Sequence, residues 1–455
     1  MRLTPENLSV IPSNVTRPNY ARDKCGVGIV HFGIGAFHRA HQAVYTDDVL
    51  NHEGGDWRIT AVSLRSKTVA MQMNPQDGLY TLSERSETGH KLRIIGSVKN
   101  VLVAPENPEA VINILSVPTT HIVSFTITEK GYCRAPDGTL DFKKANAGSI
   151  YAYLKKAFEN RQRSGVSGLT LLSCDNLAGN GAQLEGLMTE YLAHAAPELL
   201  PWFKENCTSP STMVDRIVPA TTEADRAEVS GLLGVQDAAT IGTEPFVQWV
   251  IEDNFLGPRP AWEKHGVQFT DNVHAYETAK LRMLNGAHSA LAYLGLKHGH
   301  EFVHQAILDP QLAPLIERLM VEEAAPSLSP AEGQDLSAYS LALINRFKNP
   351  ALNHRLIQIG MDGSQKIQQR WLDTLIYHQN LGQDCPAILT AIGGWLCHIR
   401  GDNGPVDDPM SDALTAQWNS VGKDGIVYAI FSDDGLLASK WKPSISDKTF
   451  ILQSL

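Results

Sequence analysis

The segment IVHFGIGAFHRAHQAVY, residues 29–45, indicates the fold class of the first half of the chain. It places Gly33 and Gly35 between an apolar strand and a helix that is expected to begin near His38. In a dinucleotide-binding fold, one such glycine permits the tight turn and the next lets the backbone approach a pyrophosphate at the helix N-terminus. His38 stands where the motif G-x-G-x-x-G has its third glycine, so an ordinary strand-to-helix turn is the alternative. The strand context favours a cofactor site with Gly33, Gly35, Phe37 and His38.

The end of the second expected strand, VSLRSKT (62–68), bears on which dinucleotide binds. A site for NAD usually offers a carboxylate at this point, which binds the ribose hydroxyls. This chain has Arg65 and Lys67 instead, next to two hydroxyl side chains, and such a set suits a 2′-phosphate. The expected cofactor is NAD, and these two basic residues make NADP possible as well. The alternative is that Arg65 and Lys67 are solvated loop charges.

Short apolar, β-branched runs alternate with helical patterns through the first half of the chain. This alternation predicts βαβ units and a parallel sheet covered on both faces. The segment 78–98 differs, because its pattern indicates a β-hairpin around a Glu-Thr-Gly turn. The four expected parallel strands are GVGIVHFG (26–33), WRITAVSL (57–64), HIVSFTIT (121–128) and LTLLSCDN (169–176).

The second half of the chain has a different pattern. Glycine and proline are dense in NFLGPRPAWEKHG (254–266), and apolar residues then recur at three- and four-residue spacing, as in EFVHQAILDPQLAPLIERLMVEEAA (301–325). We therefore predict an α/β protein with a dinucleotide-binding domain over residues 1–275 and a mainly α-helical substrate and catalytic domain over residues 276–455.

Composition narrows the classes of partner. With 455 residues and a formal net charge of −10, the chain lacks the basic balance of a nucleic-acid-binding protein. The start shows no signal-peptide pattern, and the longest apolar run, at 386–399, is too short for a membrane span. The six cysteines are scattered without metal-ligand spacing, so we expect reduced core residues and no metal; Cys174 is interpreted as a packing residue. These features predict a cytoplasmic monomer or small homo-oligomer that binds a small molecule.

The stretch KLRMLNGAH, residues 280–288, places three polar side chains within an apolar helical pattern. At about 100° per residue of an α-helix, Asn285 lies about 140° and His288 about 80° from Lys280, so the three share one sector. A lysine with a lowered pKa can act as a base, an asparagine amide can donate to an oxyanion, and a histidine can orient a hydroxyl. The alternative is a surface lysine beside a helix irregularity and a core histidine, and spacing alone does not distinguish the two.

Seven segments together resemble the mannitol dehydrogenase family of long-chain polyol and sugar-acid oxidoreductases, up to about residue 400. The resemblance implies metal-independent, NAD(P)-linked oxidation of a secondary alcohol, on a Rossmann-type domain followed by a helical domain. The segments are HFGIGAFHRAHQA, LLSCDN, MVDRIVPA, EPFVQWVIEDNF, RPAWEKHGVQF, KLRMLNGAHSALAYLG and MDGSQK.

The resemblance also implies roles for individual residues. The family's general base falls on Lys280, and its oxyanion-stabilising asparagines fall on Asn176 and Asn285. His288 matches the substrate-orienting histidine. Glu277 matches a glutamate thought to gate the passage of protons to the lysine.

Further positions match the cofactor and substrate sites of the family. Asp215 and Arg216, in MVDRIVPA, match residues near the nicotinamide, although a structural ion pair is an equally good interpretation. Lys366 matches a substrate-contacting lysine. Polyol-specific members resemble T-E-G-G-Y where this chain has Lys130 in the third place, and they carry an arginine where this chain has Gln358.

At both positions this chain resembles the hexuronate-reducing branch of the family. That branch also shares an S-Q-K-x-x-Q-R pattern, which ends here at Arg370. A sugar acid adds a carboxylate, which Lys130, Lys366 or Arg370 can bind. The resemblance therefore favours reduction of D-fructuronate to D-mannonate. The first alternative is a mannitol 2-dehydrogenase or related polyol dehydrogenase, and the second is a non-catalytic sugar-acid or dinucleotide sensor.

Overall fold

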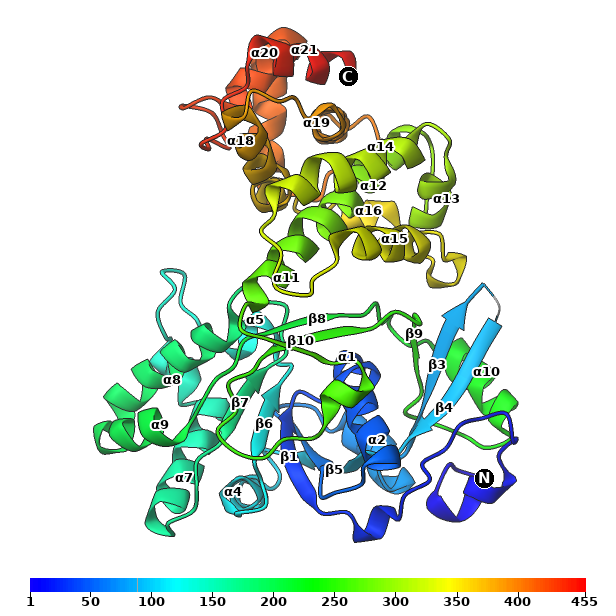
Figure 1. Cartoon of the computed structure of the whole chain (residues 1–455), viewed down its shortest axis with the longest axis vertical. Coiled ribbons are helices and arrows are strands. Elements are labelled where there is room, and N and C mark those ends of the chain that lie inside the picture. The colour runs from blue at the N-terminus through cyan, green and yellow to red at the C-terminus, as the bar shows by residue number, and fades with distance from the viewer. Residues whose placement is uncertain (88) are drawn as a thin grey trace. The chain divides into compact units, whose positions relative to one another are not determined.

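The structure is a computed structural model of the whole chain, and it describes residues 1–87 and 89–455, apart from the side chain of Leu352. The chain forms two compact units, Met1–Val273 and His274–Leu455. In Figure 1 the colour follows the chain from blue at the N-terminus to red at the C-terminus.

A five-stranded parallel sheet forms the centre of the N-terminal unit, in the order β5-β2-β1-β6-β7. All four parallel strands expected from the sequence are present, and each lies within its predicted run. The strand β5 was not predicted, because it directly follows the hairpin segment. The strands are β1 (Val27–Phe32), β2 (Arg58–Ser63), β5 (Val98–Val103), β6 (Ile122–Phe125) and β7 (Thr170–Ser173).

Helices cover both faces of this sheet, as predicted (Figure 1). Side chains of β1 alternate between two apolar clusters: Val30 and Phe32 join the cluster under α4, α7 and α8, while Ile29 joins the cluster under α2 and α3. The helices of this unit are α1 (Ala36–Ala40), α2 (Gln42–His52), α3 (Thr68–Met73), α4 (Pro108–Ser116), α5 (Thr128–Gly131), α6 (Phe142–Ala145), α7 (Ile150–Arg163), α8 (Asn180–Ala195), α9 (Leu200–Asn206) and α10 (Glu223–Leu233).

Two small sheets complete the N-terminal unit. The predicted hairpin is confirmed as the antiparallel pair β3 (Tyr80–Ser86) and β4 (Gly89–Ile95), and β9 (Ile241–Thr243) pairs with β3. Thr88 of the predicted turn lies outside the described residues. The other sheet consists of β8 (Thr212–Asp215), β10 (Gln248–Glu252) and β11 (Gln268–Thr270).

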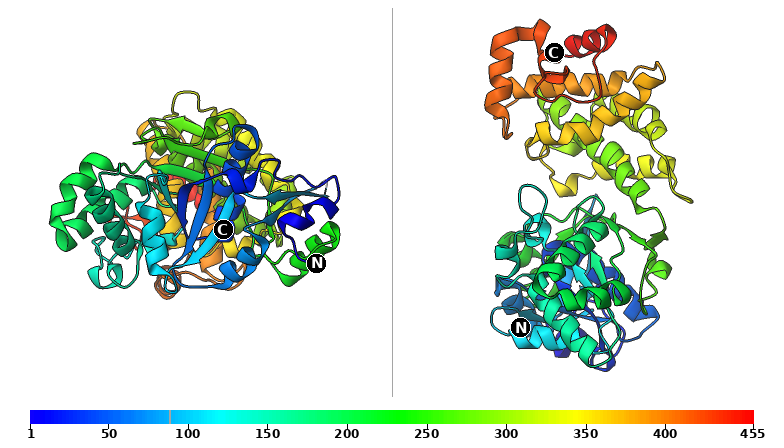
Figure 2. Two further views of the ribbon diagram at one scale, coloured as in Figure 1. Left: turned by 90° about the horizontal axis from the view of Figure 1, so that it is seen from below. Right: turned by 90° about the vertical axis from the view of Figure 1, so that its left-hand side faces the viewer.

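The C-terminal unit consists of helices and their connections, as Figure 2 shows in green to red. The apolar run 386–399 is the buried core helix α19, which explains why it carries so little charge. Among the described helices, none combines the length and apolar character needed to cross a membrane. The helices are α11 (Val273–Ala279), α12 (Gly286–Lys297), α13 (Val303–Leu308), α14 (Leu312–Arg318), α15 (Leu336–Phe347), α16 (Leu356–Ile359), α17 (Gly363–Ile367), α18 (Asp373–Asn380), α19 (Pro386–Ile399), α20 (Ser411–Phe431) and α21 (Ile445–Gln453), with π-helical segments η6 (Lys280–Asn285), η7 (Leu319–Ala324) and η10 (Gln368–Leu372).

All six cysteines are free. Four are buried, as expected, but Cys25 and Cys207 are only partly buried. Cys174 packs in the core beside β7, and burial raises the pKa of its thiol well above the usual value. The packing role inferred for Cys174 from the sequence therefore agrees with its environment.

Candidate functional site

The glycine turn after β1 lies where the strand order of the sheet reverses, between β1 and β6. Gly33 has a φ of +95°, and a Cβ at this position would lie 2.0 Å from the carbonyl oxygen of Thr126. Gly35 precedes α1, and a Cβ there would meet nothing closer than an oxygen at 3.8 Å. The backbone is therefore open to a ligand at Gly35. In parallel α/β sheets this switch point is the dinucleotide-binding position, so the local geometry fits a dinucleotide.

His38 is fully buried at the position of the missing third glycine. Its ring stacks on His31 of β1, with ring centroids 3.4 Å apart. Nδ1 of His31 lies 2.8 Å from the Ser124 hydroxyl, and its Nε2 lies 2.9 Å from the Thr126 hydroxyl. The stacked rings thus hold α1 against β1. In the motif G-x-G-x-x-G, the third glycine instead allows the helix and the strand to pack closely because it has no side chain. The side chain of His38 belongs to the core; Phe37 is half-buried and stacks on a neighbouring histidine.

This histidine pair makes folding sensitive to mild acid. Burial lowers the pKa of His31 from 6.5 to about 3, and burial followed by the neighbouring His31 lowers the pKa of His38 well below 6.5. Below pH 6.5 the unfolded chain binds protons that the folded chain does not, so stability falls as the pH drops toward 3. We expect His31 alone to remove about 2 kcal/mol of stability between pH 7.5 and pH 5.0. Urea unfolding at the two pH values measures this loss.

The variant His31→Gln is the control for this prediction. Glutamine does not titrate, so the variant is expected to be less stable at pH 7.5 but to lose less stability on acidification than the wild type. An equal pH dependence in both proteins would contradict the assignment to His31.

Arg65 and Lys67 lie in the loop after β2, and both are exposed. Neither side chain forms an ion pair with another described residue. The hydroxyl of Ser66 donates to the hydroxyl of Thr68 over 2.9 Å, which orders the loop between them. The two cations are therefore accessible at the end of the second strand. This is compatible with a site for a 2′-phosphate and with solvated loop charges.

The guanidinium of Arg216 bonds to protein groups on several sides. It is buried and donates to the carboxylate of Glu84 at 2.6 Å and to the carbonyl of Ala40 at 2.6 Å. Two further bonds reach the carbonyl of Glu244. These contacts support the structural interpretation of Arg216; Asp215 ends β8 and is buried.

Asn176 and Lys130 follow the carboxyl ends of two neighbouring strands, β7 and β6, and both are exposed. The buried Asp175 joins the two connections. Its carboxylate accepts hydrogen bonds from the backbone N–H groups of Ile127 at 3.0 Å and Thr128 at 2.8 Å. It also accepts one from the Tyr132 hydroxyl at 2.8 Å. The sequence motifs assign no role to Asp175, although an acidic residue close to the carboxyl end of a buried strand is a usable signal.

Lys280 and Asn285 begin and end the π-helical segment η6. This corrects the regular helix assumed from the sequence, because the i→i+5 bonding of a π-helix brings residues five apart toward one row. The 140° separation of an α-helix therefore does not apply to this pair. Lys280 is partly buried, and Glu277, one turn earlier, is buried with Oε2 3.6 Å from Nδ1 of His274.

His288, in the first turn of α12, is buried. Its ring centroid lies 4.7 Å from that of Phe347 and 5.3 Å from that of His354. Burial, followed by the charges of His354 and two arginines, lowers the pKa of His288 well below 6.5. The ring is therefore neutral near pH 7, with one donor and one acceptor nitrogen.

Arg370, in η10, reaches back to the helix that carries His288. Its guanidinium donates to the hydroxyl of Ser289 at 2.6 Å and to the carbonyl of Asn285 at 3.3 Å. Burial lowers the pKa of Arg370 to about 10, and it has no carboxylate partner among the described residues. Arg370 thus retains donors and a positive charge that no carboxylate among the described residues neutralises.

Lys366, one turn before Arg370, is partly buried and bonds the carbonyl of Met361. Its ammonium group lies 3.7 Å from a carboxylate oxygen of Asp362, and burial, with the nearby Arg370, lowers its pKa. Gln358, on α16, is exposed. Four of the proposed residues lie on adjoining segments of the C-terminal unit, since η6 packs against both η10 and α12. They are Lys280, Asn285, His288 and Arg370.

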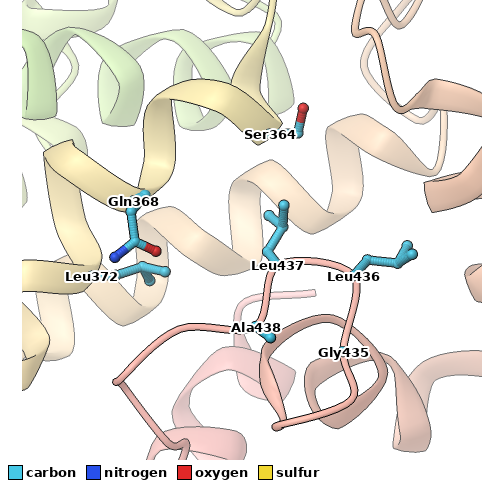
Figure 3. Close-up of a pocket in the computed structure, with 7 residues that line it drawn as sticks. All are labelled: Ser364, Gln368, Leu372, Gly435, Leu436, Leu437 and Ala438. Atoms are coloured by element: carbon cyan, nitrogen blue, oxygen red, sulfur yellow. The ribbon is translucent and has the colours of Figure 1, made fainter. Parts of the chain in front are cut away.

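A cavity of about 350 Å³ lies beside η10 in the C-terminal unit (Figure 3). None of the described residues that line it is titratable, so these residues offer no acid, base or fixed charge for catalysis. Its lining residues are Ser364, Gln368, Leu372, Gly435, Leu436, Leu437 and Ala438.

Comparisons with known proteins cover both units. The family described as mannitol dehydrogenase Rossmann domain matches residues 27–264, and the mannitol dehydrogenase C-terminal domain matches residues 272–435. The chain is 42% identical over 422 residues to the uncharacterized oxidoreductase YeiQ of Escherichia coli, covering 89% of this chain and 86% of that protein. It is 39% identical over 456 residues to the D-mannonate oxidoreductase of the same organism, covering 94% and 93%.

A solved structure is also similar. The mannitol 2-dehydrogenase of Pseudomonas fluorescens, in a ternary complex with NAD and D-mannitol, has a TM-score of 0.80 and 34% sequence identity. The alignment covers 100% of this chain and 95% of that one.

Proposed function

Because the chain belongs to the mannitol dehydrogenase family and is an oxidoreductase acting on CH–OH groups, we propose that it interconverts a 2-keto sugar acid and its secondary alcohol with NAD. The pair D-fructuronate and D-mannonate is the best candidate. The chain resembles the D-mannonate oxidoreductase over nearly the whole length of both proteins.

The environment of Arg370 favours a sugar acid over a neutral polyol as the substrate. A neutral polyol offers hydroxyl groups, which need no fixed cation. A carboxylate needs a cation or several donors in a partly desolvated place, and Arg370 is a partly buried guanidinium without a carboxylate partner among the described residues. Lys366, one turn away, adds a second positive charge.

The chemistry follows from the proposed roles of the polar side chains. Gly33 and Gly35 would hold NAD at the glycine turn, and NAD would supply the acceptor for the hydride that leaves the carbinol carbon. Lys280 takes the hydroxyl proton of the alcohol, and in the reverse direction it returns that proton to the carbonyl oxygen. Asn176 and Asn285 donate hydrogen bonds to the oxygen as negative charge develops on it.

Two further residues support this proton transfer. The neutral His288 orients a substrate hydroxyl through one ring nitrogen. Glu277, buried one turn before Lys280, relays the proton away from the lysine. No step requires a bound metal ion.

Mannitol is the second candidate substrate, because the similar structure from Pseudomonas fluorescens is a complex with D-mannitol. A polyol enzyme with this sequence would leave the charge of Arg370 without an anion. Oxidation of mannonate and mannitol by the purified chain, followed as NADH formation, separates the two candidates. We expect kcat/KM for mannonate to exceed that for mannitol at least about 100-fold, the value of one charge-assisted contact of about 3 kcal/mol.

The same assay compares NAD with NADP. The exposed Arg65 and Lys67 predict measurable turnover with NADP as well as NAD.

Brisk mannitol oxidation without mannonate turnover would overturn the sugar-acid proposal and leave the polyol reaction.

A further inference from the structure

Three metal-binding side chains converge at the far end of α12, away from the residues proposed for catalysis. They are His298 and His300, which follow the helix, and Asp309, which follows α13. Their ligand atoms all lie within 4.8 Å of one another. Both imidazoles approach the same carboxylate oxygen: Nδ1 of His298 lies 3.1 Å and Nε2 of His300 lies 2.8 Å from Oδ2 of Asp309.

We propose that this His-Gly-His/Asp cluster binds one divalent transition-metal ion, with zinc as the best match. Zinc accepts two imidazole nitrogens and a carboxylate oxygen at bond lengths of about 2.0–2.2 Å. In a tetrahedral site with such bonds, the ligand atoms lie about 3.3 Å apart. The two N···O separations, 3.1 and 2.8 Å, are within about half an ångström of that value, and the two ring nitrogens lie within 4.8 Å of one another, so side-chain rotations make room for the ion.

The backbone fixes both histidines. The N–H of His298 donates to the carbonyl of Leu294 at 3.0 Å, and that of His300 donates to the carbonyl of Gly295 at 2.9 Å. Between them, Gly299 has a φ of +81°, which turns the chain back on the helix end. The two rings are therefore presented on one side of a defined helix C-terminus.

The carboxylate is oriented as well. Oδ1 of Asp309 accepts the backbone N–H of Gln311 at 2.8 Å, which leaves Oδ2 for the two histidines or for a metal ion. Such outer contacts are typical of metal sites because they fix the ligand orientation. The three side chains are 28%, 26% and 14% exposed, so an ion can enter from solvent and keep a water ligand.

The site would join the C-terminus of α12 to the turn between α13 and α14. His288 lies in the first turn of the same helix. A bound ion therefore stabilises the helix that carries a proposed substrate-binding residue without touching the reacting atoms. This inference does not depend on the identity of the substrate.

Zinc titration of the tag-free, chelator-treated full chain tests the proposal. By isothermal calorimetry we expect one zinc ion per chain with a dissociation constant of about 10 μM or below, from three protein ligands. Each of the variants His298→Ala, His300→Ala and Asp309→Asn should weaken binding at least about 30-fold. Asparagine at 309 keeps an oxygen for the Gln311 N–H and so preserves the turn.

His304→Gln is the matched control, because His304 lies four residues after His300 and outside the cluster. It should bind zinc as the wild type does. Cobalt(II) adds a geometric readout, since a four-coordinate site gives intense visible absorption that the His300→Ala variant should lack. No binding at 1 mM zinc, or equal binding by the wild type and the His300→Ala variant, would overturn the proposal and leave a hydrogen-bonded cluster.

Discussion

Replacing Lys280 with alanine is expected to lower kcat by about 10²- to 10⁴-fold, the usual contribution of a general acid–base group. The loss follows because no other proposed residue accepts the hydroxyl proton directly. Dissociation constants for NAD and for the substrate should change little. Steady-state kinetics, together with NADH binding followed by fluorescence, separates the loss in kcat from any loss of binding.

Two variants sharpen this test. Lys280→Arg keeps the positive charge but cannot lose its proton near neutral pH, so it should be as inactive as the alanine variant. Lys297→Ala, at the exposed end of α12, should retain wild-type activity. Small primary amines in solution should restore part of the activity of Lys280→Ala. Wild-type turnover by Lys280→Ala would show that the proposed mechanism is wrong, even though the family is established.

Replacing Arg370 with methionine is expected to raise KM for mannonate by about 10- to 150-fold. Charge-assisted hydrogen bonds contribute about 1.5–3 kcal/mol, and methionine keeps the side-chain volume without the charge. Any activity toward mannitol should fall far less, since a polyol has no carboxylate. The ratio of kcat/KM values for the two substrates is therefore the decisive measurement.

Stability distinguishes a substrate-binding role for Arg370 from a structural one. Loss of the bonds to Ser289 and Asn285 is offset by removal of a partly desolvated cation, so the thermal midpoint should stay near that of the wild type. Arg355→Met is the matched control, because Arg355 is exposed and paired with Glu301 at 2.7 Å. An equal loss for both substrates, together with a lower midpoint, would assign Arg370 to the fold.

Much of the N-terminal unit could be predicted from local pattern. The strands around Val30, Ile59, Val123 and Leu171 are short, mainly apolar runs, as is typical of a parallel sheet buried on both faces. The hairpin was equally visible, because two strand-like runs on either side of a Glu-Thr-Gly turn are a local property of the sequence. The small sheet of β8, β10 and β11 was not predicted, because its strands are short and pair over long sequence distances.

The proposed site, too, could be predicted only in part from the sequence. The residue types in KLRMLNGAH were visible in the sequence, but the π-helical segment that alters the spacing of Lys280 and Asn285 was not, since tertiary packing can override the preferred helix geometry. The role of Asp175 also needed the structure. Two of its partners, Ile127 and Thr128, lie 48 and 47 residues away in the chain.

By itself, the sequence determined the alternation of strands and helices, the glycine turn and the family resemblance, because each depends on residues that are neighbours in the chain. Three features became visible only in the folded chain: His38 stacks on His31, Arg370 lacks a carboxylate partner among the described residues, and Asp309 meets two histidines. The physical reason is that burial and charge compensation depend on what surrounds a side chain in space, and those neighbours come from distant parts of the chain.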